Sequence, residues 1–300
     1  MENNEKKEMD NSLDAMRKFT GDQNLQVIGI DESFGFKCQQ CGKCCMNRED
    51  IILNPFDIYN GAKYLGITTE EFLMKYTHFD LGGYSKIPMV LLRTTENGFC
   101  PLLKFDVKDG CKFKCMIHPA KPGACANHPI GVAYATNKTT GDTSTTYIKV
   151  EQCPNSVSDE MHTVRDWVKP YLDHQDEIDA AHKIQSSVMD YFDPRELFII
   201  LRIMTGLADK ASVAPAKEFA RTAQHLMTQF AATVVQVAYG CYDINRPFVE
   251  QVEENQEELD KFYTHTKSLF DALKAGFHSI AGMPFDEALK KYNEREGRLS

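Results

Sequence analysis

The chain has 300 residues, of which 42% are hydrophobic and 26% are charged, and its formal net charge is -9. This usage is enough for an apolar core without disulfides, in one or two domains. An acidic chain is poorly suited to phosphate contacts, so we expect no nucleic-acid partner. Residues 1–10 are polar and no apolar run could span a bilayer, so we expect no membrane partner and a cytoplasmic location, where thiols stay reduced.

Two helices are predicted early in the chain by their capping residues. Asn54 is a favourable N-cap with Pro55 at the first helical position, and Gly66 can end that helix. Thr68 and Glu71 have the spacing of a capping box, which predicts a second helix directly afterwards.

The remaining first-half elements are predicted to be short strands and turns. Residues 1–25 are expected to form a loose leader, helical or disordered. Asn97-Gly98 and residues 137–141 are typical of turns. Strands are expected at residues 25–30, 87–93, 131–136 and 143–150.

Past residue 155 the apolar residues follow helical spacing. Met161, Val164, Val168 and Tyr171 fit one helix, which Pro170 should kink or break. Cys241 follows an apolar helix and is expected to be a buried core thiol. Further helices are expected from residue 193 to 207, along the apolar stripes of residues 219–237 and 252–277, and at 284–292.

These elements predict an α+β fold that is predominantly helical. A flexible leader (residues 1–25) precedes a loop-rich, cysteine-cluster domain with a few short strands (residues 26–155). A helical bundle (residues 156–300) follows it. The bundle carries no motif that we can interpret, and it is where we expect contact with another protein, if one binds. The oligomeric state is left open.

Nine of the ten cysteines lie between Cys38 and Cys153. The sharpest motif is residues 38–45, CQQCGKCC, in which two cysteines separated by two residues can turn both sulfurs toward one ion. Gly42 tolerates a positive φ, which allows backbone N–H groups to point at the sulfurs. Adjacent Cys44 and Cys45 point apart, so one of them could serve a second ion, bridge two metals or stay free.

The arrangement resembles the CxxCxxCC family, also called YkgJ-like, over roughly residues 34–154. The resemblance rests on the opening motif, an aspartate near Asp57, Cys-Pro at 100–101, residues 115–125 ending in Pro-x-x-Cys, and Cys-Pro at 153–154. The chain departs from the family pattern with Lys121, Ala126 and His128, and Cys111 is additional. The resemblance implies metal ligation by Cys38, Cys41, Cys44, Cys45, Cys100, Cys115, Cys125 and Cys153.

Several functions remain open at this point. The favoured hypothesis is a zinc or iron site, including a 4Fe-4S cluster, that organises the loop-rich domain. The family's flagellin lysine-N-methylase relatives imply an alternative, an iron–sulfur, S-adenosylmethionine-dependent protein-lysine N-methyltransferase, so whether the chain is an enzyme is undecided. A redox or metal-delivery role is the third hypothesis. Which cysteines share an ion, and whether one or two sites form, cannot be chosen from spacing. His118 and His128 are expected to support the site more than to ligate.

Overall fold

Helices dominate the structure, and small antiparallel sheets accompany them, which confirms the predicted α+β, predominantly helical class. The predicted leader, Cys111 and Cys153 lie outside the described residues. The computed structural model describes residues 26–83, 85–107, 112–136, 143–150, 158–210 and 214–296.

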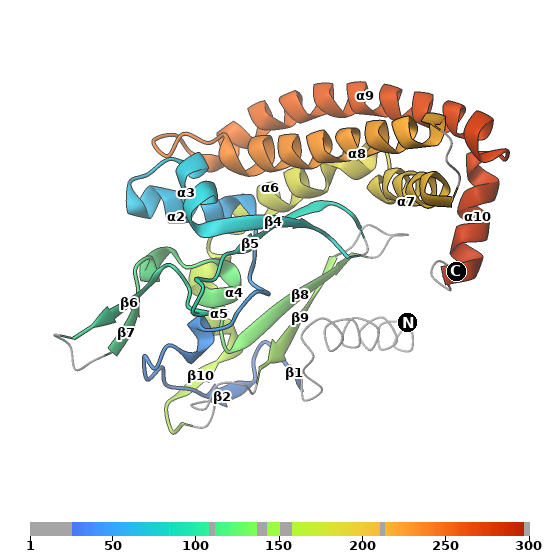
Figure 1. Cartoon of the computed structure of the whole chain (residues 1–300). Coiled ribbons are helices and arrows are strands. Elements are labelled where there is room, and N and C mark those ends of the chain that lie inside the picture. Colours follow the sequence, from blue (N-terminus) through green and yellow to red (C-terminus); the bar gives the residue numbers. More distant parts are fainter. Residues whose placement is uncertain are drawn as a thin grey trace.

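A three-stranded antiparallel sheet of order β1-β9-β8 lies in the lower half of the molecule in Figure 1. It contains β1 (Gln26–Ile28), β8 (Ile130–Thr136) and β9 (Thr143–Lys149), so three of the predicted strands are confirmed. The predicted turn between β8 and β9 lies outside the described residues. Beside this sheet, β2 (Ser33–Gly35) pairs with β10 (Met161–Thr163).

Both predicted early helices are confirmed together with their caps. The side chain of Asn54 caps α2 (Pro55–Leu65), and Gly66 ends the helix with a φ of 65°. Thr68 and Glu71 form the predicted capping box of α3 (Thr69–Tyr76). These helices lie beside a second antiparallel sheet of order β3-β5-β4, made of β3 (Ile52–Leu53), β5 (Pro88–Leu92) and β4 (Thr77–Leu81).

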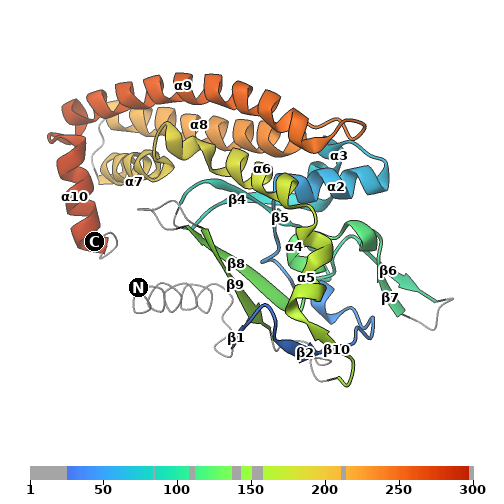
Figure 2. The ribbon, with the colours of Figure 1, turned by 180° about the vertical axis from the view of Figure 1, so that it is seen from behind.

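A two-stranded hairpin extends away from the rest of the molecule (Figures 1 and 2). It consists of β6 (Leu103–Asp106) and β7 (Lys112–Cys115), with Phe105 directly opposite Phe113. The sequence analysis did not predict these strands. Three short helical segments complete this half: the 3₁₀ turns η1 (Lys43–Cys45) and η2 (His118–Ala120), and α4 (Gly123–Ala126).

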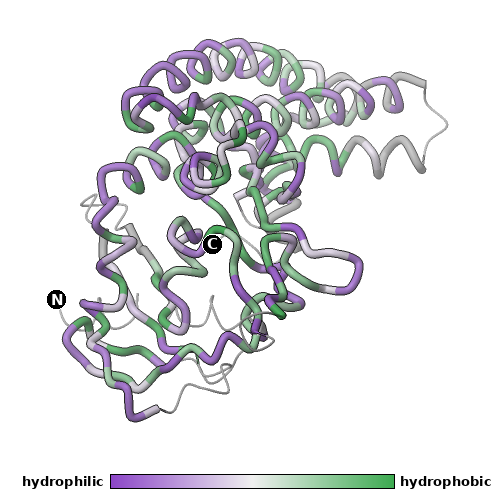
Figure 3. Tube along the Cα trace, turned by 90° about the vertical axis from the view of Figure 1, so that its left-hand side faces the viewer, coloured by the Kyte–Doolittle hydropathy of each residue, from purple (hydrophilic) through white to green (hydrophobic). Residues whose placement is uncertain are grey.

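The second half is helical, and its long helices cover the β3-β5-β4 sheet (Figures 1 and 2). Their apolar faces join the largest core, in which Phe72 of the first half and Phe230 of the second are both fully buried. Figure 3 shows hydrophilic and hydrophobic residues alternating along the uppermost helix, as expected for a helix with one solvated face. The elements are α5 (Val164–Leu172), α6 (Gln175–Ser186), η3 (Ser187–Asp190), α7 (Pro194–Lys210), α8 (Ala214–Val235), a π-helical turn η4 (Gln236–Gly240), α9 (Phe248–Ala281) and α10 (Phe285–Glu296).

Three second-half expectations are corrected. Met161 lies in β10, and α5 begins only at Val164, because Thr163 caps it by accepting a hydrogen bond from the Asp166 N–H. The helix does not break at Pro170 but continues to Leu172. Cys241 is exposed: it follows the π-helical turn as its C-cap, while the neighbouring Tyr242 is buried in the core. In addition, α6 was not predicted.

Among the described residues, no helix has the combination of length and apolar character that a membrane span requires. The boundary near residue 155 stays a prediction, and the largest apolar core includes residues from both sides of it.

Candidate metal centre

The CQQCGKCC loop is wound tightly around Gly42. Gly42 has a φ of 74°, as its position between the cysteines predicted, and its carbonyl accepts the N–H of Cys45 at 2.8 Å. A Cβ atom there would lie 2.9 Å from Cγ of Phe113. Both the backbone conformation and the contact with the β6–β7 hairpin therefore require glycine.

Backbone pairing brings Cys45 next to Cys100. The N–H of Cys100 donates to the carbonyl of Cys45 at 2.8 Å, and the N–H of Asn47 donates to the carbonyl of Gly98 at 2.6 Å. The predicted turn at Asn97-Gly98 is confirmed, with a φ of 76° at Gly98. A segment 55 residues further along the chain is thus held against the first motif (100 − 45).

The hairpin then positions Cys115 relative to Cys100. Cys115 pairs with Leu103 in the β6–β7 register. The N–H of Leu103 donates to the carbonyl of Cys100 at 3.0 Å, which places the first residue of β6 directly after the Cys100 turn. Cys100 and Cys115 are therefore neighbours across a short hairpin.

Asp57 fixes the turn that carries Cys125. Its Oδ1 accepts the N–H of Gly123 at 3.0 Å and the hydroxyl of Tyr171 at 3.1 Å, while Oδ2 accepts the N–H of Asn54 at 3.0 Å. Burial raises the pKa of Asp57 to about 6, against the lowering effect of these hydrogen bonds. Asp57 therefore has a positioning role, joining the start of α2 to the α4 turn.

The thiols of Cys44, Cys45, Cys100, Cys115 and Cys125, called the five-thiol cluster below, lie close enough for their charges to affect one another. Burial, together with the charges of the neighbouring Cys100 and Cys115, raises the pKa of Cys125 to about 12. Burial likewise raises the pKa of Cys100 to about 11. Thiolates gathered in this way repel one another, so a cation among them would favour their ionised form.

Cys44 and Cys45 form a coupled pair, with their Sγ atoms 3.9 Å apart. The Cys45 thiol donates to the Cys44 thiolate, which lowers the pKa of Cys44 to about 6. The same hydrogen bond raises the pKa of Cys45. The hydrogen bond therefore favours ionisation of Cys44 over that of Cys45.

Two cations lie near the five-thiol cluster. Lys121 and Arg48 both help to lower the pKa of Cys44. Arg48 is held by two hydrogen bonds to Asp50, at 2.6 and 2.9 Å. Lys121 stands at a position where the sequence departs from the family pattern, yet it still places a positive charge beside the thiols. The sequence analysis missed Arg48, and it missed Tyr171 because no local pattern links Tyr171 to Asp57.

The predicted ligands are only partly brought together. Cys38 and Cys41 are not members of the five-thiol cluster; Cys38 is exposed, and the carbonyl of Gln40 between them accepts the N–H of Phe113 at 3.0 Å. Cys111 and the predicted ligand Cys153 lie outside the described residues.

The two histidines differ in their surroundings. His118 lies in η2 and is exposed, although partial burial lowers its pKa. His128 packs edge-on against Phe36, and burial lowers its pKa to about 4. Its Nε2 is buried and has no hydrogen-bond partner among the described residues.

The donor chemistry of the cluster fits zinc or iron, because both bind thiolates. The sulfur atoms are farther apart than in a metal-bound site, since no three cysteine, histidine, aspartate or glutamate side chains within the described ranges converge on one ion. Binding would require the sulfurs to move toward one another.

Residues 37–154 match the model of the CxxCxxCC family, which carries the description "Putative zinc- or iron-chelating domain". The matched segment contains the five-thiol cluster together with Cys38, Cys41 and Cys153. No curated protein and no solved structure matched the chain.

Proposed function

We propose that residues 37–154 bind zinc or iron through cysteine thiolates, and that the ion mainly organises this part of the fold. The observation that carries the proposal is the gathering of five thiols from three separated segments, residues 44–45, 100–115 and 125. Reduced thiols of this kind are expected in the cytoplasm, which is where we place the protein.

The ligands are proposed to come from Cys38, Cys41, Cys44, Cys45, Cys100, Cys115, Cys125 and Cys153. Metal binding to thiols whose pKa is raised displaces their protons, and the energy of the metal–sulfur bonds draws the sulfurs together. Asp57 would hold the Cys125 turn in place during this closure, and Lys121 and Arg48 would balance the negative charge left on the thiolates.

Elemental analysis of protein purified without oxygen tests the binding. The wild type is expected to contain zinc or iron in stoichiometric amounts, and the triple variant Cys44→Ser/Cys100→Ser/Cys125→Ser is expected to lose most of it. Cys241→Ser is the matched control, because Cys241 lies outside the matched segment and is exposed. Equal metal content in the triple variant and the wild type would refute the assignment.

The visible spectrum of the same sample separates the candidate metals. A colourless protein with zinc would favour a structural site. A brown protein with iron and acid-labile sulfide would favour a cluster, and binding of S-adenosylmethionine would then be measured by calorimetry. No described residue favours the methyltransferase alternative over the structural role.

Hydrogen exchange tests the structural role separately. Removal of the metal is expected to accelerate exchange around residues 43–47, 98–103 and 115–125, while the amides of α8 and α9 stay protected. Unchanged protection in all three cysteine segments would leave metal binding in place but refute an organising role.

A further inference from the structure

A cleft with a volume of about 890 Å³ lies between α6 and the sheets, away from the five-thiol cluster. Its size falls within the range of small-molecule pockets, roughly 300–1,000 Å³. No cysteine is among its lining residues, so the proposed metal centre does not account for it.

One wall of the cleft is the polar face of α6. Gln175, Asp179, His182 and Ser186 follow one another at helical spacing and all line the cleft. The opposite face of the same helix carries Ile178, Ala181 and Ile184, which are buried in the main core. The helix is thus fixed by its apolar face and presents its polar face to the cleft.

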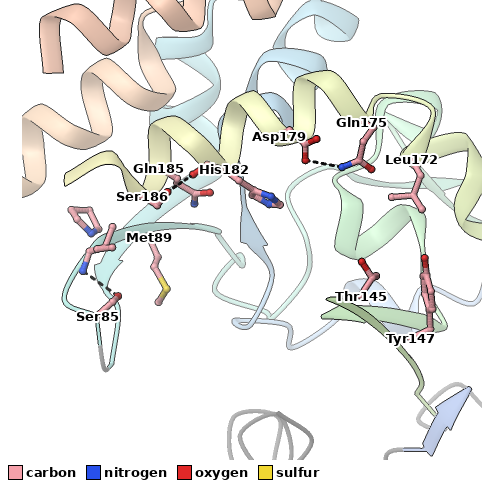
Figure 4. A pocket seen from close by; sticks show the side chains of 12 residues that line it. Ser85, Met89, Thr145, Tyr147, Leu172, Gln175, Asp179, His182, Gln185 and Ser186 are labelled. Atoms are coloured by element: carbon pink, nitrogen blue, oxygen red, sulfur yellow. Dashed lines mark hydrogen bonds between the residues drawn. The ribbon is translucent and has the colours of Figure 1, made fainter. Parts of the chain in front are cut away.

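The second wall belongs to β9. Thr145 and Tyr147 are two residues apart on this strand, so their side chains lie on the same face of the sheet. Figure 4 shows both extending from the strand toward the α5–α6 side of the cleft. In the same view His182 projects from α6 toward the sheets. Hydroxyl groups and an imidazole therefore face a common space from opposite sides.

The third wall is apolar. Ile87, Pro88 and Met89 at the start of β5, together with Leu172 at the end of α5, line the cleft. This surface suits the hydrocarbon part of a ligand, whereas the α6 face suits its polar end.

The cleft carries the negative charge of Asp179, and its other polar side chains can accept hydrogen bonds. Asp179 is held in place by the amide N–H of Gln175 at 2.7 Å. Gln185 donates one amide N–H to the hydroxyl of Tyr239 at 2.6 Å, and its carbonyl oxygen can accept. Burial lowers the pKa of His182, which disfavours the charged form of its ring. Among the described residues that line the cleft, none is lysine or arginine.

We propose that this cleft binds an organic cation, an ammonium or guanidinium group on an apolar stem. The cation pairs with Asp179 and donates to the neighbouring acceptors of α6 and β9, while the stem packs on Met89, Ile87 and Leu172. Anionic ligands are disfavoured because the cleft offers a carboxylate and no basic side chain. A free amine and a basic side chain of a peptide share this chemistry.

Ligand-observed NMR titration of the full chain with n-butylguanidinium tests the proposal. The isosteric neutral n-butylurea and the anion valerate are titrated alongside. Saturable binding of the cation, at least about tenfold tighter than that of the urea, is the expected result. Equal binding of cation and urea, or no saturable binding of the cation up to about 20 mM, would overturn it.

Two variants locate the binding. Asp179→Asn is expected to weaken cation binding about tenfold, because it removes the charge and keeps the shape. Asp176→Asn is the matched control: it removes the same charge from an exposed residue of α6 that does not line the cleft. Thr145→Arg places a cation inside the cleft at an exposed position and is expected to abolish binding. Equal affinity of the two aspartate variants would refute the site.

A blocked Gly-Arg-Gly peptide and its citrulline counterpart distinguish the two sources of the cation. Tighter binding of the arginine peptide than of n-butylguanidinium would identify a peptide side chain as the ligand. Tighter binding of the free guanidinium would identify a small molecule. In both cases Asp179→Asn must weaken the preferred ligand, or the proposal fails.

Discussion

The helical half and the cysteine-rich region are held together by different interactions. In the helical half, large side chains such as Phe230, Tyr263 and Phe277 are fully buried in one continuous core. Between residues 37 and 50, by contrast, no described hydrophobic side chain is buried, and Phe99 and Phe105 nearby are exposed. Between residues 37 and 50, the position of the chain is defined by hydrogen bonds, by the close packing around Gly42 and by the cluster of thiols.

This difference indicates where an ion would matter. Apolar burial stabilises the helices without any ligand, at about 1.5–3 kcal/mol for each large side chain. The loop of residues 37–50 buries little apolar surface, although Leu102 and Ile117 beside the later cysteines are buried in the core, and the gathered thiols oppose one another when ionised. A metal would contribute what the core does not, so perturbations of the two regions should have separable effects on stability and on metal content.

The largest effect on stability is expected from Phe230→Ala in the helical core. Phe230 is fully buried and packs against Phe192, with ring centroids 5.6 Å apart. Loss of the ring should lower the free energy of unfolding by about 3–5 kcal/mol. Denaturant titration followed by circular dichroism measures this loss. The metal content of the folded protein should remain that of the wild type.

Leu269→Ala is the control for the core substitution, because Leu269 lies on α9 but is 42% exposed. Its effect on the unfolding free energy should stay within about 0.5 kcal/mol. Loss of metal from folded Phe230→Ala would contradict the separation of the two regions.

A smaller stability effect with a larger effect on metal is expected from Asp57→Ala. The substitution leaves the N–H of Gly123 and the hydroxyl of Tyr171 without their acceptor, which should cost about 2–3 kcal/mol. Because the Cys125 turn is no longer fixed, metal affinity should fall about 10–100-fold. Competition with a chromophoric chelator measures it. Asp80→Ala removes an exposed carboxylate from β4 and should change neither quantity.

Gly42→Ala and Gly66→Ala compare two glycines that share a positive φ but differ in surroundings. An added Cβ at Gly42 meets Phe113 at 2.9 Å, whereas at Gly66 nothing lies within 4 Å. Gly66→Ala should cost about 1 kcal/mol of stability from backbone strain alone and leave metal binding intact. Gly42→Ala should also displace the loop from the hairpin and weaken metal binding. Equal metal affinity in the two variants would show that the Gly42 contact is unimportant.

The sequence predicted elements whose determinants are local. Asn54, Gly66 and the Thr68–Glu71 box act within a few residues, and both helices were found with their caps. The β6–β7 hairpin was missed, because its strands are short and contain Lys104, Lys112 and Lys114, which weaken any strand pattern. Cys241 was misplaced because apolar spacing continues into η4, while the direction in which the chain leaves that turn depends on tertiary packing.

At the candidate site, too, the sequence predicted the features that neighbouring residues determine. Cysteine type and spacing identified the matched segment and the need for a flexible glycine at position 42. The contact between Asp57 and Tyr171 spans 114 residues, and no pattern within one sequence reports such a distance. The choice among cysteines was likewise beyond spacing, because it depends on how residues 98–100 pair with residues 45–47.

The smallest perturbation, which leaves the fold unchanged, is alkylation of the metal-free protein by iodoacetamide near pH 7. The pKa of Cys44 is lowered to about 6, so its thiolate predominates, whereas the pKa of Cys125 is raised to about 12. Since the thiolate is the nucleophile, Cys44 should be modified before Cys125. Peptide mapping by mass spectrometry gives the order.

Below pH 6 the rate at Cys44 should fall as its thiolate takes up a proton. Bound metal should protect both residues, with exposed Cys241 as the internal reference. Modification of Cys125 as fast as Cys44 would contradict the electrostatic order within the five-thiol cluster.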